Sequence, residues 1–323
     1  MMGNSIEALI IGGGIVDIPL SPVTEAVFRN GSTPLDAIHM QPGGDALNES
    51  VALTRLGHQA ALVTKVGLDA AGDYLIRTLD GAGVYTGLIR REDGLDTGIN
   101  VVLVSPDGER RFITSQSGSL RRLALRDILP ALDAPEIRTV KIACLASMFV
   151  SPMLTIPDTR TLFARLKGMG LILCADTTRP KNGERAEDLA EILPLLDYFF
   201  PNLSEARALT GKEAPEAVAD AFLALGLKHI AIKLGGQGCY IASRDTRAFV
   251  PAWPDAHCVD TTGAGDTFAA GFIAGLLEGR SFIDCARLAN AAASVCVEAV
   301  GAGAALKGRE EPQRRFEILR RRE

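Results

Sequence analysis

The segment Asp260–Phe268, DTTGAGDTF, places a carboxylate directly after three small residues, where an apolar helix pattern begins. Gly263, Ala264 and Gly265 present backbone N–H groups without bulky side chains, and the first N–H groups of a helix have no partner within it. Together with the helix dipole, such donors favour a bound anion. Asp266 in the same turn can accept a proton, since the dipole favours its ionised form. The segment could hold a transferring phosphoryl group, with Asp266 as the base. For the four residues GAGD alone, the plainer interpretation is a glycine turn with Asp266 as an N-terminal residue of the helix, and the whole segment with its partner motifs favours the phosphoryl loop.

Glycines and polar side chains near the N-terminus could hold a small polyol. Asp17 follows the triple glycine Gly12–Gly14, but the dinucleotide-binding spacing G-x-G-x-x-G fails because its third glycine would fall on Asp17. A carboxylate there can accept protons from two hydroxyls, although a turn aspartate is the plainer interpretation. Gly43 and Gly44 let the backbone approach a ligand closely, and Asn48 offers donors and acceptors. Asn48 could equally be a polar residue on an exposed helix face.

These motifs form a set that resembles one protein family. DTTGAGDTFAAGF, from Asp260 onward, resembles the C-terminal signature of the ribokinase-like (PfkB) carbohydrate kinase family. Four further segments resemble motifs of that family: GGDALN at 43–48, VGLDAAG at 66–72, NLSE at 202–205 and IKLGGQG at 232–238. The resemblance spans roughly residues 8 to 303. It implies an α/β fold in which helices flank a mainly parallel, doubly wound sheet and a small β-sheet forms a lid.

The same resemblance assigns roles around a substrate and a nucleotide. Its sugar-binding positions are Asp17, Gly43, Gly44 and Asn48. Its nucleotide-binding positions are Asn202, Lys233, Gly235, Gly238, Thr261 and Asn290, although Asn290 could equally lie on a helix surface. Asn202 and Glu205 would orient the Mg²⁺–phosphate hydration shell through water, because oxygen ligands suit Mg²⁺. Capping of a helix by Asn202 could coexist with that role. ATP and Mg²⁺ are the expected cosubstrate and cofactor.

Two features depart from the family pattern or weaken it. Asp260 and Thr262 match positions that hold a monovalent cation in some members, which would make K⁺ an activator. The other expected ligands come from a loop around Val300–Gly301, and its sequence, VEAVGAG, departs from the commonest pattern. Asp45 stands where a small or basic residue is common. It either caps a helix or changes the choice of substrate.

Short apolar runs alternate with longer amphipathic stretches, as in a doubly wound α/β fold. The predicted strands are Glu7–Ile11, Ala60–Val66, Val140–Leu145, Leu171–Ala175, Tyr198–Phe200 and Ile230–Leu234. The predicted helices are Ala46–Leu56, Ala70–Ala82, Pro157–Lys167, Arg185–Leu196, Pro215–Leu225 and about Thr267–Glu278. Two further stretches form strands with no helix between them. One is Leu35–Met40. The other is a hairpin made of Ile99–Val104, a turn at Ser105–Gly108, and Glu109–Thr114. We expect a single domain over 1–323, with lid strands from about 12–42 and 97–116.

Composition and charge argue against several other classes of protein. Acidic residues outnumber basic ones, 39 against 34, and no dense basic stripe occurs apart from a short tail beginning at Arg314. A nucleic-acid partner is therefore not expected. No apolar run approaches the roughly 18–20 residues that span a bilayer, and the N-terminus leads into a strand rather than a signal peptide. The six cysteines form no C-x-x-C pair, so we expect buried, reduced thiols in a cytoplasmic protein. Exposed lid edges and family habit favour a homodimer.

The residues and the resemblance together predict ATP-dependent phosphorylation of a primary hydroxyl on a small polyol. We expect a sugar or sugar acid, as for ribokinases, fructokinases and ketodeoxygluconate kinases. The first alternative is a nucleoside kinase, which would share every motif. However, the lid has few aromatic side chains to stack on a base, Phe112 being the main one. The second alternative is a non-catalytic sugar or nucleotide sensor, against which the retention of Asp266, the loop glycines, Asn202 and Glu205 argues.

Overall fold

The computed structural model describes residues 5–106 and 109–321, and its centre is an eight-stranded sheet. Its strand order is β15-β14-β13-β12-β11-β10-β1-β5. The parallel strands are β1 (Ala8–Ile11), β5 (Ala60–Val63), β10 (Ile142–Met148), β11 (Ile172–Thr177), β12 (Tyr198–Phe199) and β13 (His229–Lys233). An antiparallel hairpin of β14 (Cys239–Ser243) and β15 (Arg247–Val250) completes one edge. The mainly parallel sheet expected from the apolar runs is confirmed.

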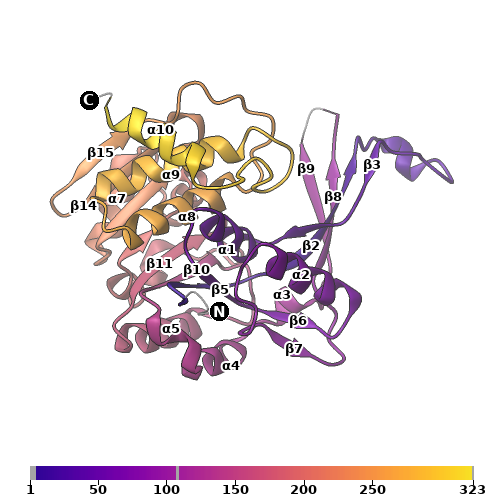
Figure 1. Cartoon of the computed structure of the whole chain (residues 1–323), viewed down its shortest axis with the longest axis horizontal. Helices are drawn as coiled ribbons and strands as arrows, with labels where there is room; N and C mark the ends of the chain where they lie inside the picture. The colour runs from indigo at the N-terminus through magenta and orange to yellow at the C-terminus, as the bar shows by residue number, and fades with distance from the viewer. Residues whose placement is uncertain (1–4, 107–108, 322–323) are drawn as a thin grey trace.

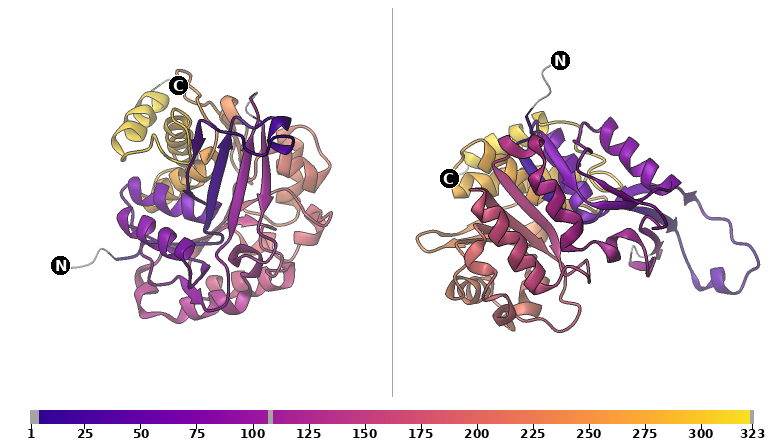
Figure 2. Two further views of the ribbon diagram at one scale, coloured as in Figure 1. Left: turned by 90° about the vertical axis from the view of Figure 1, so that its right-hand side faces the viewer. Right: turned by 90° about the horizontal axis from the view of Figure 1, so that it is seen from below.

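Helices cover both faces of this sheet (Figures 1 and 2). One face carries α1 (Asp45–Arg55), α2 (Ala70–Gly81), α8 (Ala264–Leu277) and α9 (Phe282–Cys296), with α10 (Glu310–Arg320) packed on α9. The other carries α4 (Leu125–Ile128), α5 (Ile156–Gly168), α6 (Leu203–Thr210) and α7 (Pro215–Ala224). Strand side chains alternate between the two layers: Ala8 and Ile10 join the first core, whereas Leu9 and Ile11 join the second.

A separate small sheet extends to one side of the molecule (Figure 1). Its strands are β2 (Ile15–Ser21), β3 (Ala37–Ile38), β4 (Gln41–Gly43), β8 (Ile99–Val104) and β9 (Arg110–Thr114). The order is β3-β2-β8-β9, and β4 pairs with the start of β2. The predicted hairpin is confirmed, since β8 and β9 pair antiparallel. Part of its turn, at residues 107–108, lies outside the described residues.

Three predicted elements differ from the structure. The run Ala60–Val66 is two strands, because the chain leaves the main sheet after Val63 and β6 (Lys65–Gly67) pairs instead with β7 (Arg90–Glu92). Only Ala37–Ile38 of the predicted strand Leu35–Met40 pairs in the sheet. The predicted helix Arg185–Leu196 is wrong: it contains two 3₁₀ turns, Ala186–Leu189 and Leu193–Leu195. Pro194 lacks the N–H that an α-helix needs there and restricts the residue before it.

The sequence also led to predictions about the cysteine thiols and about membrane-spanning segments. The cysteines carry free thiols, and five of them are buried as expected, whereas Cys258 is exposed. Among the described helices, none combines the length and the apolar character that crossing a membrane requires.

Candidate active site

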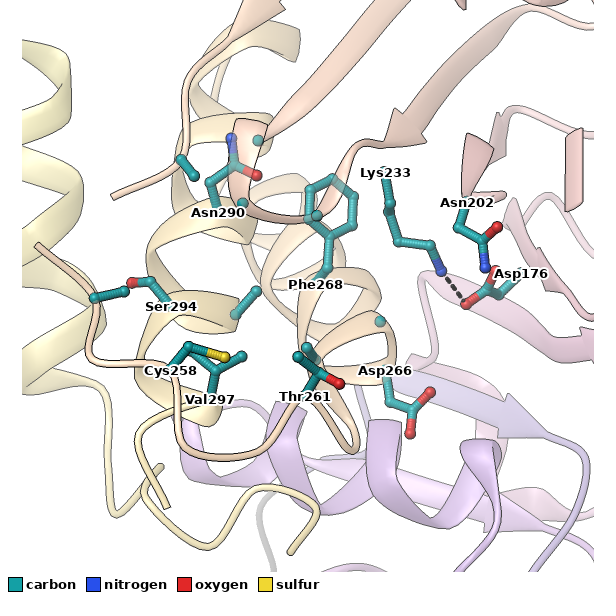
Figure 3. A pocket seen from close by; sticks show the side chains of 18 of the residues that line it. Asp176, Asn202, Lys233, Cys258, Thr261, Asp266, Phe268, Asn290, Ser294 and Val297 are labelled. Carbon is teal, nitrogen blue, oxygen red and sulfur yellow. Dashed lines mark hydrogen bonds and ion pairs between the residues drawn. The ribbon is translucent and has the colours of Figure 1, made fainter. Parts of the chain in front are cut away.

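A cavity of about 570 Å³ opens at the carboxyl ends of the central strands (Figure 3). Ser147 near the end of β10, Asp176 near the end of β11 and Lys233 at the end of β13 all line it. Ligands in open α/β sheets bind at this edge. The first turn of α8, which carries Asp266, lines the same cavity. Four chain segments far apart in the sequence therefore converge on one site.

The predicted anion loop forms the start of α8. The helix begins at Ala264, three residues before the predicted Thr267, so the loop residues belong to its first turn. Gly263 is the N-cap with φ +75°, and a Cβ atom built there would lie 2.7 Å from the Cβ of Ala302. Thr261, Ala264 and Gly265 line the cavity. The Ala264 N–H donates to the carbonyl of Thr261 at 3.2 Å, so this predicted phosphate donor already has a backbone partner.

Asp266 lies between the cavity and α1. Asn48 on α1 donates a hydrogen bond of 2.7 Å from Nδ2 to Oδ2 of Asp266. Burial, followed by the nearby carboxylate of Asp45, raises the pKa of Asp266 well above its ordinary range. Burial and like charge thus oppose the helix dipole, which by itself favours the ionised form expected from the sequence. A raised pKa suits a base that must hold a proton during transfer.

Asp45 is part of the same site. It stands in the first turn of α1, lines the cavity, and accepts a hydrogen bond from the hydroxyl of Ser147. Ser147 has φ 53°, a left-handed backbone conformation that is costly for a non-glycine residue and is frequent at functional sites. Burial, and then the charge of Asp176, raise the pKa of Asp45 to about 6. Asp45 therefore lines the same cavity as Asp266 and lies close enough for its charge to act on that carboxylate.

The predicted sugar-binding residues lie together beside α1. Asp17 on β2 accepts a hydrogen bond of 3.0 Å from the amide of Asn100 on β8. A Cβ atom at Gly43 would overlap the carboxylate of Asp17, so glycine is required for this approach. Gly44 is the N-cap of α1 with φ 96°. Neither Asp17 nor the two glycines line the 570 Å³ cavity, and Asn48 connects this group to Asp266.

The predicted nucleotide-binding residues surround the other end of the cavity. Lys233 and Asp176 form an ion pair of 2.7 Å (Figure 3), and a Cβ atom on Gly265 would lie 3.2 Å from the Lys233 ammonium. Burial alone would lower the pKa of Lys233, but Asp176 and then Glu205 raise it to about 12. The ammonium is thus charged and adjacent to the anion loop. Phosphate oxygens could share it with Asp176.

Glycines and a buried asparagine shape the wall that faces the nucleotide. Gly235 and Gly238, with φ 60° and 98°, form the turn after Lys233 and line the cavity. Asn290 also lines it, and its Nδ2 donates to the carbonyls of Val250 and Pro251 at 3.0 Å each. Asn290 is only 4% exposed, so it is not a helix-surface residue. Its hydrogen bonds hold the chain that leads to Trp253, another lining residue.

Asn202 and Glu205 form a reciprocal cap at the start of α6. The Asn202 side chain accepts from the Glu205 N–H, and the Glu205 carboxylate accepts from the Asn202 N–H, each at 2.9 Å. Both residues line the cavity near Lys233, and burial raises the pKa of Glu205 to about 7. Among the described residues no group of three or more His, Cys, Asp or Glu side chains could hold a metal. The oxygen atoms of Asn202 and Glu205 at the wall of the cavity suit the hydration shell of a Mg²⁺ ion, which usually keeps several water ligands.

Asp260 and Thr262 lie next to the anion loop, as the sequence suggested. Asp260 accepts hydrogen bonds from the N–H and hydroxyl of Thr262 at 2.9 and 2.7 Å, and from the N–H of Gly301 at 2.9 Å. The loop around Gly301 thus does meet Asp260. A further partner of Asp260, Arg110 on β9, was not anticipated.

Several site residues escaped the sequence reasoning. Asp176 directly follows the apolar run Leu171–Ala175, and a carboxylate at the end of a buried parallel strand is a signal that could have been used. Ser147, Trp253 and Arg110 have no comparable local signal. Their places depend on contacts between segments that are distant in the sequence.

The chain belongs to the pfkB family of carbohydrate kinases, because the family described as "pfkB family carbohydrate kinase" matches residues 9–308. The family, the fold class and the carbohydrate kinase activity predicted from the sequence are thereby confirmed.

Named relatives share most of the chain. It is 28% identical over 277 residues to the 2-dehydro-3-deoxygluconokinase of Bacillus subtilis, covering 83% of this chain and 84% of that protein. It is 30% identical over 276 residues to the ribokinase of Arabidopsis thaliana, covering 80% of this chain and 68% of that protein.

Solved structures share the fold. The Arabidopsis thaliana ribokinase complexed with ribose and ATP superposes with a TM-score of 0.81 at 25% identity, covering 97% of this chain and 99% of that one. The fructokinase of Xylella fastidiosa with bound ATP superposes with a TM-score of 0.79 at 21% identity, covering 99% and 100%.

Proposed function

We propose that this kinase transfers the γ-phosphoryl group of ATP to a primary hydroxyl of a sugar or sugar acid. The observation that carries the proposal is the position of Asp266. On one side Asn48, from the predicted sugar-binding group, donates to its carboxylate at 2.7 Å. On the other side the first turn of α8 and Lys233 line the cavity predicted for the nucleotide. The named relatives act on a sugar acid and on ribose, which supports both substrate classes.

The reaction needs a base beside the acceptor hydroxyl. Asp266 accepts the hydroxyl proton while the oxygen forms a bond to the γ-phosphorus and the bond to the bridging oxygen of ADP breaks. Asp17 and Asn100 hold the other hydroxyls, so that the primary hydroxyl faces Asp266. The N–H groups of the first turn of α8 donate to the equatorial oxygens of the transferring group.

The chain supplies positive potential at the nucleotide end through Lys233 and the dipole of α8. Lys233 holds the phosphate oxygens on the side opposite the acceptor. Asn202 and Glu205 would hold a Mg²⁺ ion through its water ligands, and that ion would supply positive charge to the phosphate oxygens. The cavity volume of about 570 Å³ suits a ligand of nucleotide size.

The small sheet would act as the lid of a single catalytic unit that spans the chain. Its β8–β9 hairpin brings Asn100 to Asp17 and Arg110 to Asp260, which are on the substrate and phosphate sides respectively. Ile38 and Ile113 on this sheet are exposed by 63% and 58%. Pairing of two lids in a homodimer, which would cover such side chains, stays a prediction.

A nucleoside kinase is the second candidate, and one observation favours it. Phe112 is paired with Val102 in the β8–β9 hairpin and shares its face with Asn100 and Arg110, both of which contact site residues. Phe112 is 57% exposed, so its ring is accessible for stacking on a nucleoside base.

ADP release over a panel of acceptors tests the proposal. The panel contains ribose, fructose, 2-dehydro-3-deoxygluconate and adenosine, each with MgATP, and ³¹P NMR locates the new phosphate ester. We expect turnover with a sugar or sugar acid and a product phosphorylated on a primary carbon. A higher kcat/KM for adenosine would replace the proposal with the nucleoside kinase. Binding of sugar and ATP without any ADP release would favour a sensor.

A further inference from the structure

Arg110 connects the lid to the anion loop. It lies on β9, and its Nη2 donates a hydrogen bond of 2.5 Å to Oδ1 of Asp260, 150 residues further along the chain. Side chains two residues apart on a strand, and those of cross-strand partners, point to one face of a sheet. Arg110 therefore shares its face of the β8–β9 hairpin with Asn100, whose amide holds Asp17. One face of the lid thus reaches both the substrate group and the anion loop.

The Oδ1 atom of Asp260 has no acceptor position left for a metal ion. Its Oδ1 accepts from the N–H and the hydroxyl of Thr262 and from Arg110, and its Oδ2 accepts from the N–H of Gly301. Each carboxylate oxygen offers two lone-pair positions, so the three donors saturate Oδ1, while Oδ2 keeps one position beside the Gly301 N–H. A monovalent cation at Oδ1 would have to displace one of these donors, and at Oδ2 it would compete with the positive charge of Arg110.

The charge of Asp260 is also already neutralised. Its side chain is 7% exposed, and a carboxylate so buried requires a cationic partner. Burial alone would raise the pKa of Asp260, but the donors from Gly301 and Thr262, together with the charge of Arg110, hold it below its ordinary value. The residues that the sequence assigned to a monovalent cation thus do not fit one in this chain, because a guanidinium takes that place.

We infer that Arg110 is the built-in cation of the anion loop, replacing a monovalent metal ion at Asp260. Arg110 is a positioning residue in this role: it acts on the phosphoryl group through Asp260 and the loop that follows. Because the cation is delivered by the lid, the loop is complete only while β9 lies over the site. The effect of Arg110 on catalysis rests on the proposed phosphoryl transfer. Its occupancy of the cation site does not.

Removal of the guanidinium should create the cation requirement that the intact protein lacks. The variants are Arg110→Ala and, as a matched control, Arg111→Ala. Arg111 is the next residue of β9, is exposed, and points to the opposite face of the hairpin. Each protein is assayed in tetramethylammonium buffer and then with added KCl, NaCl or guanidinium chloride at low millimolar concentration and constant ionic strength. Two quantities are recorded: kcat/KM for MgATP, and the melting temperature without substrates.

The expected pattern is specific to a cation site. When K⁺ is added, the kcat/KM of the unaltered protein and of Arg111→Ala should change by less than about twofold. Without K⁺, Arg110→Ala should lose about tenfold in kcat/KM, the effect of removing one charge-assisted partner. Added K⁺ or guanidinium should restore most of the kcat/KM that Arg110→Ala has lost. The melting temperature of Arg110→Ala should also rise with K⁺ concentration, because an ion that binds only the folded protein stabilises it.

Other patterns would overturn the inference. Strong K⁺ activation of the unaltered protein would show that a metal ion binds despite Arg110. A loss of kcat/KM in Arg110→Ala that no cation restores, with KM raised for the acceptor, would make Arg110 a substrate ligand instead. Full activity of Arg110→Ala without K⁺ would show that Arg110 does not serve as the cation of the anion loop. If no acceptor supports turnover, the proposed function fails, yet the melting temperatures with and without K⁺ still decide whether Arg110 occupies the cation site.

Discussion

Asn48 and Asp266 are separated by 218 residues, and the amide of the first donates to the carboxylate of the second at 2.7 Å. The contact joins α1, which follows the glycine pair of the predicted sugar site, to α8, which begins at the predicted phosphate site. Asp266 is thereby fixed at the junction of the two sites. Its protonation is set by what surrounds it: burial and Asp45 raise its pKa, and Asn48 lowers it.

Asp266→Asn should lower kcat by about 10³-fold, because an amide cannot accept the hydroxyl proton, and general bases contribute factors of this order. The asparagine keeps the shape of the side chain and the start of α8, so the dissociation constant for ATP should change little. Single-turnover ADP formation measures the first quantity and fluorescence titration with ATP the second. Turnover close to that of the unaltered protein would remove Asp266 from the base role.

Asn48→Ala should move the acid limb of the kcat/KM profile to higher pH. The Asn48 amide stabilises the ionised form of Asp266, so its loss raises the pKa of Asp266 further and leaves less base at a given pH. At the pH optimum of the unaltered protein, kcat/KM should also fall by about tenfold through loss of a hydrogen bond to a charged group. A pH profile from 5 to 9 is the measurement. An unshifted acid limb would show that another group controls it.

Asp45→Asn should move the same limb in the opposite direction. The pKa of Asp45 is raised to about 6, so its carboxylate is charged at neutral pH and disfavours ionisation of Asp266. Replacing it with a neutral amide therefore lowers the pKa of Asp266, and activity should persist to lower pH. Asn48→Ala and Asp45→Asn control for each other, since a general effect of disturbing α1 would shift both profiles in one direction.

The sequence predicted those parts of the site that have a local cause. The cap formed by Asn202 and Glu205 follows from an N-x-x-E pattern before a helix, and the glycine at position 263 follows from a loop that must expose N–H groups. The parallel strands follow from apolar runs. In contrast, Lys233 meets Asp176 across 57 residues and Arg110 meets Asp260 across 150, and such pairs depend on how the layers pack. Asp45 was recognised as unusual, but only the fold places it beside Ser147.

Gly263→Ala should destabilise the protein by about 2 kcal/mol and reduce phosphoryl transfer. Its φ of +75° is unfavourable for any residue with a Cβ atom, and that atom would lie 2.7 Å from Ala302. Because Gly263 caps α8, relief of this overlap must shift the anion loop. Urea denaturation and kcat measure the two effects. Gly168→Ala is the control, since no atom lies within 4 Å of its added Cβ and its φ is not positive. An equal response of both variants would contradict the explanation.

Glu49→Gln should remove a dependence of stability on pH. Glu49 is fully buried on α1, neither carboxylate oxygen has a hydrogen-bond partner of ordinary geometry, and the thiol of Cys144 is the donor nearby. Burial, and then the charges of Asp176 and Asp266, raise its pKa well above the ordinary 4.5. The folded state therefore retains a proton that the unfolded chain loses, so the contribution of Glu49 is fully present below pH 4.5 and declines as the pH rises towards the folded-state pKa.

Glutamine cannot ionise, so the free energy of unfolding of Glu49→Gln should exceed that of the unaltered protein by an amount that grows between pH 5 and pH 8. Groups common to both proteins cancel in this difference. Urea denaturation at half-unit pH intervals measures it, with Glu216→Gln on the exposed side of α7 as the control that should show no such trend. A difference that is constant with pH would mean that Glu49 ionises in the folded protein at the same pH as in the unfolded chain, which would contradict the raised pKa.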